Sequence, residues 1–160
     1  MLKPHMQKEE KQITDSRILN EILKTGKYAH ISLCDENVPY IITLSYGYDV
    51  STNCLYFHTA KKGYKLEFIK NNPQACGTVV EDLGYQSGKC DHHYRSVVFW
   101  GEINIIKPMK EQKYAFDILL NHLDENPKKS KSRFLNTKSK YENTCILKFE
   151  IEEITGKGSE

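Results

Sequence analysis

The stretch PYIITLSYGYDVSTNCLYFHTAKKGYKLEFIKNNP, residues 39–73, decides the fold. Its opening part, 39–49, is rich in Ile, Thr and Tyr, residues that favour β-strands. The polar segment 50–53 turns the chain back into a second strand, 55–59, and this order of strand, turn and strand predicts an antiparallel hairpin. A helix is expected over 62–71, where Asn71-Asn72-Pro73 ends it.

The rest of the chain extends this pattern on both sides. The other expected elements are helices over 14–24 and 108–123, strands over 28–34, 75–82, 95–106 and 145–154, and loops over 83–93 and 127–140. Polar turns join most of the strands, and Gly101 indicates a bend or bulge in its strand. The pattern predicts a mainly β member of the α+β class, a six-stranded antiparallel barrel with about three peripheral helices.

The chain of 160 residues shows no internal repeat and no clear linker. A single domain is therefore expected over residues 1–160, with residues 1–13 as a flexible arm. No apolar run reaches the 18 residues of a membrane-spanning helix, and the N-terminus lacks the apolar stretch of a signal peptide. The five cysteines form no Cys-x-x-Cys pair, so reduced thiols and a cytoplasmic location are expected.

The formal net charge is only +2, although six positive charges and no negative one fall within residues 127–140. A nucleic-acid-binding domain is usually basic as a whole, so a nucleic-acid partner is not expected. The basic segment is interpreted as a solvated loop, because Phe134 is its one aromatic residue able to stack on a base.

The segment LYFHTAKKGYK, residues 55–65, places a strand end at a threonine hydroxyl and three lysines around the start of a helix. Free N–H groups at a helix N-terminus attract an anion. Lysines in a helix's first turn are unfavourable against the macrodipole, so a bound phosphate would offset them. The alternative is an exposed helix start with solvated lysines, and the spacing alone leaves both readings open.

Thr43, Leu44, Ser45 and Tyr46 form a strand segment on which a flat heteroaromatic ligand could lie. Ordinary β-propensity of Thr and Tyr is the alternative. Arg95 and Ser96, at a strand start, are candidates for contacting the polar part of a ligand. The nearby Cys90-Asp91-His92-His93 is interpreted as a loop and not as a metal site, since adjacent histidines on an extended chain point in opposite directions.

Read together, four segments resemble the pyridoxamine 5′-phosphate oxidase-like FMN-binding split barrels, and most of all their nitroimidazole-resistance type. These are PYIITLSYGYD, LYFHTAKKGYKLEFIKNNP, YRSVVFWGEI and FEIEEITGK. The resemblance covers about Thr14 to Lys157. It implies a six-stranded split β-barrel, a homodimer, and one FMN in each of two grooves at the dimer interface.

The resemblance also implies roles for individual residues. Tyr64 stands where the oxidases have an arginine, a phosphate charge that Lys61 or Lys62 would replace, and Ser96 stands where they use a glutamine from the other subunit. His58 matches a histidine near the substrate in the nitroimidazole-resistance type and is the expected catalytic residue. The expected cofactor-binding residues are Thr43, Leu44, Ser45, Tyr46, His58, Thr59, Lys61, Lys62, Tyr64, Lys65, Arg95 and Ser96. The oxidases' C-terminal substrate motif has no equivalent here, which argues against pyridoxine phosphate as substrate.

The functional prediction is an FMN-dependent oxidoreductase that reduces small electron-poor molecules, nitro compounds or quinones, with electrons from a reduced nicotinamide or a low-potential carrier. The alternative is a non-catalytic flavin- or haem-binding split barrel, in which His30, His58, His92 or His93 would ligate the haem iron. A third hypothesis is a nucleic-acid-associated protein that uses the basic loop.

Overall fold

Seven strands and five α-helices make up the computed structural model, which describes residues 7–159. The strands are β1 (Gln12–Ile13), β2 (Tyr28–Asp35), β3 (Val38–Asp49), β4 (Cys54–Thr59), β5 (Gln74–Gln86), β6 (Asp91–Ile106) and β7 (Cys145–Ser159). The helices are η1 (Glu9–Lys11, a 3₁₀ turn), α1 (Ser16–Thr25), α2 (Tyr64–Asn71), α3 (Met109–Leu123), α4 (Pro127–Phe134) and α5 (Lys138–Glu142).

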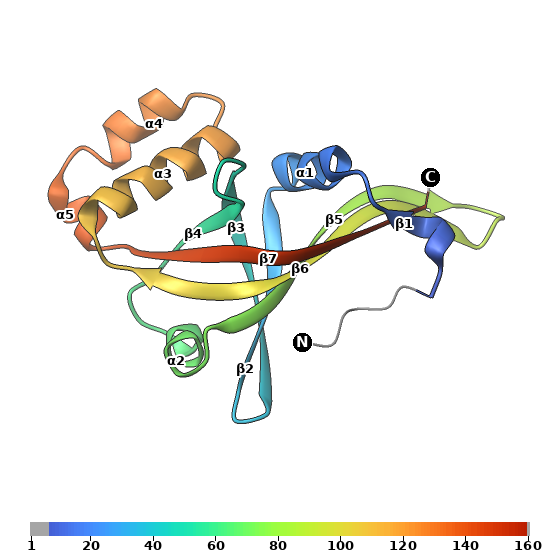
Figure 1. Ribbon diagram of the computed structural model, residues 1–160. Coiled ribbons are helices and arrows are strands. Elements are labelled where there is room, and N and C mark those ends of the chain that lie inside the picture. Colours follow the sequence, from blue (N-terminus) through green and yellow to red (C-terminus); the bar gives the residue numbers. More distant parts are fainter. Residues whose placement is uncertain (1–6, 160) are drawn as a thin grey trace.

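The sheet closes on itself through the long strand β7. Strands follow the order β7-β4-β3-β2-β5-β6, and β6 pairs again with β7, so six antiparallel strands form a ring. β1 adds to the part of β7 beyond β4, where Gln12 pairs with Lys157. Helices α3, α4 and α5 gather on one side of the ring, and α2 lies on another (Figure 1). The predicted α+β class and six-stranded barrel are confirmed, with β1 as an additional strand.

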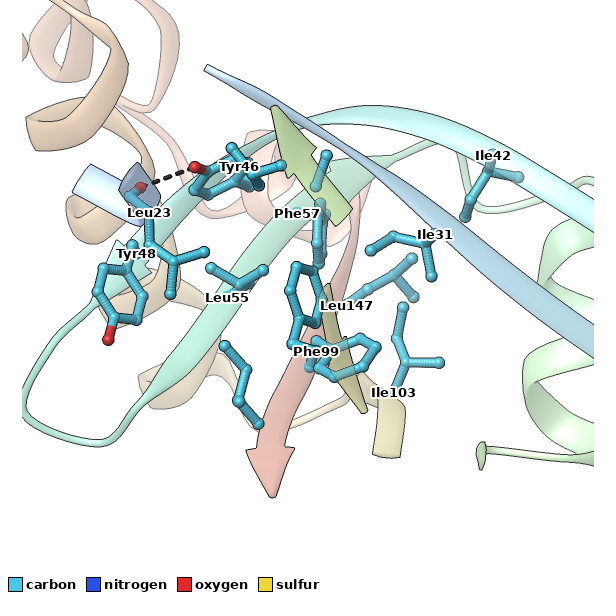
Figure 2. Packing of buried hydrophobic residues seen from close by; sticks show 14 of the residues in the cluster. Leu23, Ile31, Ile42, Tyr46, Tyr48, Leu55, Phe57, Phe99, Ile103 and Leu147 are labelled. Atoms are coloured by element: carbon cyan, nitrogen blue, oxygen red, sulfur yellow. Dashed lines mark hydrogen bonds between the residues drawn. The ribbon is translucent and has the colours of Figure 1, made fainter. Parts of the chain in front are cut away.

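Alternation of side chains divides the apolar residues between two clusters. Inward residues of the barrel form the main cluster, and Figure 2 shows Tyr46, Phe57 and Phe99 among them. The rings of Phe99 and Phe149 meet edge to face, with 5.0 Å between their centroids. The opposite face of β4 contributes Cys54 and Tyr56 to a second cluster beneath α3 and α5. The same strand thus supports the barrel on one face and the helices on the other.

Two of the expected loops are wrong. The polar loop expected over 83–93 is mostly strand, because β5 and β6 continue as a paired hairpin through Gln86 and Asp91. The basic segment 127–140 is not a loop but contains α4 and the start of α5. Asn126 caps α4 by accepting a bond from the Lys129 N–H at 3.2 Å, and Lys131 pairs with Asp117 at 2.5 Å, which offsets part of the basic charge.

The chain start also differs from the arm expected over residues 1–13. Residues 1–6 lie outside the described residues. Beyond them, η1 leads into β1, whose pairing with β7 is a long-range contact that no local pattern signals. Within residues 7–159, no helix is long and apolar enough to cross a membrane.

The β3–β4 turn is built around the buried carboxylate of Asp49. Its oxygens accept bonds from the Ser51 N–H (3.0 Å) and hydroxyl (2.7 Å), the Thr52 hydroxyl (2.7 Å) and the Tyr114 hydroxyl (2.7 Å). Burial alone would raise the pKa of Asp49, but these bonds favour the charged form and lower the pKa to about 2. Because Tyr114 belongs to α3, the carboxylate also ties that helix to the barrel.

We expect Asp49→Asn to lower the free energy of unfolding by about 2 kcal/mol at neutral pH. The folded-state pKa lies below the ordinary value of 3.8, so the stabilisation is complete above about pH 5 and is lost as the pH falls towards 2. Urea denaturation across this range should show the gap between parent and variant closing. Glu125→Gln, at an exposed carboxylate, should leave stability unchanged, and a gap that stays constant with pH would contradict this role.

Candidate functional site

The outer face of β3 carries the predicted ligand strand. Ile41, Thr43 and Ser45 are exposed on it, and Ile41 keeps 66% of its surface open to solvent. Leu44 is half-buried and packs on the core, and Tyr46 is fully buried with its hydroxyl donating to the Leu23 carbonyl at 2.7 Å (Figure 2). Side-chain alternation therefore leaves Thr43 and Ser45 as the polar side chains on this face, and the role of Tyr46 in binding the cofactor stays a prediction.

A shallow cavity of about 210 Å³ continues this face onto the neighbouring strands. His30 and Ser32 of β2, Ile41 of β3, and Cys76 and Thr78 of β5 line it. The Nδ1 atom of His30 lies 2.8 Å from the Thr43 hydroxyl, which orients both side chains. Cys76 and Thr78 were not predicted as site residues, because the pairing of β2 with β5 has no signature in the local sequence.

The end of β4 separates His58 from Thr59. His58 is exposed on the face that carries Tyr56, its ring centroid lies 6.4 Å from that of Phe116, and it lines a cavity of about 230 Å³ with residues of α3 and α4. Thr59 follows on the face of Phe57 and pairs with Cys145 of β7. The structure thus brings the two side chains to opposite faces of one strand, where the resemblance had grouped them.

The start of α2 gathers positive charge next to Thr59. Gly63 precedes the helix with a φ of 139°, and Lys65 bends back so that its Nζ lies 3.5 Å from where a Cβ on Gly63 would be. In the described part of the chain, Lys61, Lys62 and Lys65 have no carboxylate partner. This free charge, beside a helix N-terminus without a side-chain cap, is suited to an anion.

The charges of nearby lysines act on the buried thiol of Cys145. Burial raises the pKa of Cys145, whereas the charges of Lys65, Lys61 and Lys70 act to lower it. Cys145 pairs with Thr59 across the β4–β7 ladder, so this strand end lies within the electrostatic influence of the lysines. Tyr64 instead packs its ring on Tyr40, with 5.4 Å between centroids, and turns towards β3.

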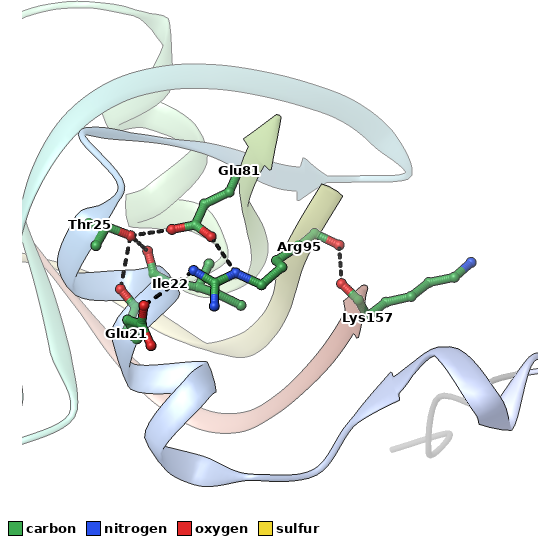
Figure 3. A network of polar contacts seen from close by, with 7 residues as sticks. Glu21, Ile22, Thr25, Glu81, Arg95 and Lys157 are labelled. Atoms are coloured by element: carbon green, nitrogen blue, oxygen red, sulfur yellow. Dashed lines mark hydrogen bonds and ion pairs between the residues drawn. The ribbon is translucent and has the colours of Figure 1, made fainter. Parts of the chain in front are cut away.

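The guanidinium of Arg95 forms ion pairs with two glutamates. Its Nε donates to Glu81 at 2.7 Å and its guanidinium pairs with Glu21 at 3.3 Å, while the Thr25 hydroxyl bonds to the same Glu81 (Figure 3). The guanidinium therefore fastens α1 to β5 and β6, and a contact of Arg95 with a ligand stays a prediction. The neighbouring Ser96 hydroxyl donates to the Lys157 carbonyl at 3.4 Å, so it too faces β7 within this subunit.

The histidines of the haem alternative are dispersed. His30 is bonded to Thr43, and His92 lies in the β5–β6 hairpin with its Nε2 2.7 Å from Asp82. His58 lines a cavity smaller than the roughly 300–1,000 Å³ of typical ligand pockets. The structure thus brings no two of these histidines to one cavity among the described pockets.

The sequence matches the model of one protein family. The family model described as pyridoxamine 5′-phosphate oxidase matches residues 15–158. Among curated proteins, none matches the sequence.

Solved structures of similar fold span several described roles. A candidate 5-nitroimidazole antibiotic resistance protein from Bacteroides thetaiotaomicron matches with a TM-score of 0.78 and 24% identity, covering 91% of this chain and 85% of its own. An FAD and heme binding protein from Mycobacterium smegmatis matches with a TM-score of 0.77 and 21% identity, covering 94% and 74%. A flavocytochrome from Azotobacter vinelandii matches with a TM-score of 0.77 and 15% identity, covering 98% and 72%. At these identities the likeness shows a shared fold.

Proposed function

The chain belongs to the pyridoxamine 5′-phosphate oxidase family, and from this premise we propose that it is an FMN-binding oxidoreductase that reduces small electron-poor molecules such as nitro compounds or quinones. Two observations support the proposal: free lysine charge and helix N–H groups gather at the start of α2 beside Thr59, and the outer face of β3 leaves Ile41, Thr43 and Ser45 exposed.

The residues present fit a flavin. Ile41 offers an exposed apolar contact for the ring, and the hydroxyls of Thr43 and Ser45 offer hydrogen bonds beside it. Lys65 and Thr59 would hold the phosphate through charge-assisted and hydroxyl hydrogen bonds. Bound FMN would supply the hydride or electron transfer, and the protein residues would anchor it and limit its access to water.

The test of cofactor identity is a spectral titration of the purified protein with FMN, FAD and riboflavin. FMN should bind at least tenfold more tightly than riboflavin, because the phosphate supplies the lysine contacts, and flavin absorbance near ~450 nm should mark the complex. Equal affinities for FMN and riboflavin would contradict the proposal that the lysines bind the flavin phosphate. If FAD binds more tightly than FMN, FAD replaces FMN as the proposed cofactor. FAD is included because the similar protein from Mycobacterium smegmatis is described as an FAD and heme binding protein.

We expect His58→Ala to change the rate of nitro-compound or quinone reduction at least tenfold, about 1.4 kcal/mol of barrier, while the melting temperature moves by a few degrees at most. His58 is exposed and its backbone stays in the β4–β7 ladder, so its side chain contributes little to folding. Steady-state rates on FMN-loaded protein measure the effect, with His93→Ala as a matched histidine control. Unchanged rates would reject a catalytic role for His58.

We expect a homodimer, with a mass by light scattering near twice 18.6 kDa. Large apolar side chains remain exposed on β2, β3 and β5, namely Tyr28, Ile41 and Val80 at 57%, 66% and 54%, and a second copy would bury them. Val80→Glu should shift the protein towards monomer, whereas Val50→Glu, in the β3–β4 turn, should not. A monomeric parent at micromolar concentration would refute the dimer and any site shared between subunits.

A further inference from the structure

A third cavity lies beside α2. It measures about 840 Å³ and is bounded by the segment before α2, by α2 itself, and by the junctions of β6 with α3 and of α5 with β7. Figure 1 shows α2 near the end of β6, where these segments meet. The volume is within the range of about 300–1,000 Å³ that holds small molecules in proteins.

Three lysines from three different segments line this cavity: Lys61, Lys70 and Lys107. None of them has a carboxylate partner within residues 7–159. The acidic side chain on the cavity wall, Glu142, already pairs with Lys138 at 3.2 Å. The cavity therefore holds positive charge that nothing in the described chain offsets, and an anionic ligand would offset it.

The floor is apolar and the wall has one unsatisfied acceptor. Leu66, Ile105 and Met109 line the floor, where an apolar or aromatic body would be removed from water. Gln112 on the wall donates from Nε2 to the Ile106 carbonyl at 3.1 Å, and its Oε1 is buried with no donor in the described residues.

We propose that this cavity, which we call the lysine cavity, binds a small organic phosphate with an apolar or aromatic body, at a site separate from the proposed flavin site. The phosphate would lie among Lys61, Lys70 and Lys107, and the body would lie on the Leu66–Met109 floor. Thr59, Lys62 and Lys65 do not line the cavity, and Lys61 is the one residue common to it and to the proposed flavin-phosphate residues, so Lys70 and Lys107 distinguish the two sites. The proposal therefore stands whether or not the protein binds FMN.

The test uses phenyl phosphate as the probe, in calorimetric titrations of the full chain, with phenol and inorganic phosphate as partial probes. Phenyl phosphate should bind at least tenfold more tightly than either partial probe, because it uses the charge and the floor together. The double variant Lys70→Gln/Lys107→Gln should weaken phenyl phosphate at least tenfold. The matched control Lys24→Gln/Lys89→Gln removes the same charge from exposed positions and should bind as the parent does.

Repeating the titration on FMN-saturated protein separates the two sites. Unchanged affinity for phenyl phosphate supports a separate site, and loss of binding would show that the cavity belongs to the flavin site and overturn the proposal. If both double variants weaken the binding of phenyl phosphate equally, the effect comes from general surface charge, and the proposal is overturned as well. If FMN itself fails to bind, the flavin proposal fails, while the titration of the flavin-free protein still decides this one.

Discussion

Lys65→Ala should weaken FMN binding about 10- to 100-fold and leave riboflavin binding almost unchanged. A charge-assisted hydrogen bond contributes about 1.5–3 kcal/mol, and each 1.4 kcal/mol is a factor of ten in affinity. Lys65 is half-buried at the start of α2, its Nζ bends back over Gly63, and its charge reaches Cys145 beside Thr59. Quenching of flavin fluorescence measures the four affinities.

Lys62→Ala is the matched control for this prediction. Lys62 is exposed in the same segment, so its loss should weaken FMN by much less than the loss of Lys65. If Lys65→Ala weakens riboflavin as much as FMN, Lys65 supports the ring or the local fold and not the phosphate. If Lys62→Ala has the larger effect, the anchor lies in the loop before the helix.

Gly101→Ala should destabilise the protein by at least about 4 kcal/mol, enough to prevent folding in a domain of ordinary stability. Gly101 has a φ of 158° at the point where the β6–β7 register shifts, and an added Cβ would collide with the Glu150 carbonyl oxygen of β7. The sequence indicated a bulge at this glycine, and the register shift confirms it. Urea denaturation and far-UV circular dichroism measure the loss.

Gly84→Ala measures the cost of placing alanine at a positive φ without a steric collision of its Cβ. Gly84 also has a positive φ, of 100°, but an added Cβ there would meet nothing within 4 Å. Its replacement should cost only about 1–2 kcal/mol, the strain of the backbone conformation. Equal losses at the two glycines would mean that β7 moves away from residue 101 at little cost.

The strands around the barrel could be predicted because each carries its own signal. Alternating Ile, Thr and Tyr over 39–49 set the outer and inner faces of β3, and Thr43 and Ser45 lie outside as alternation requires. The same rule, applied to single positions, buries the Tyr46 side chain and places His58 and Thr59 on opposite faces of β4, which the motif taken as one continuous segment does not distinguish.

Contacts between distant segments could not be predicted. Arg95 stands at a strand position suited to a ligand, and only the docking of α1 reveals that Glu81 and Glu21 already neutralise its guanidinium. The lysine cavity likewise takes Lys61, Lys70 and Lys107 from separate segments. Helix α4 was missed because its signal is a cap at Asn126 and a proline at the first turn, with little apolar periodicity.

Strand β7 has a consequence for synthesis on the ribosome. It pairs with β1, β4 and β6, and it follows all three in the sequence. Until residues 145–159 leave the exit tunnel, β4 and β6 each have an edge without its hydrogen-bonding partner, and such edges invite pairing with other chains. The nascent chain therefore cannot close its barrel before β7 has been made, and its folding yield should depend on how soon β7 leaves the tunnel and on chaperones that cover the open edges before then.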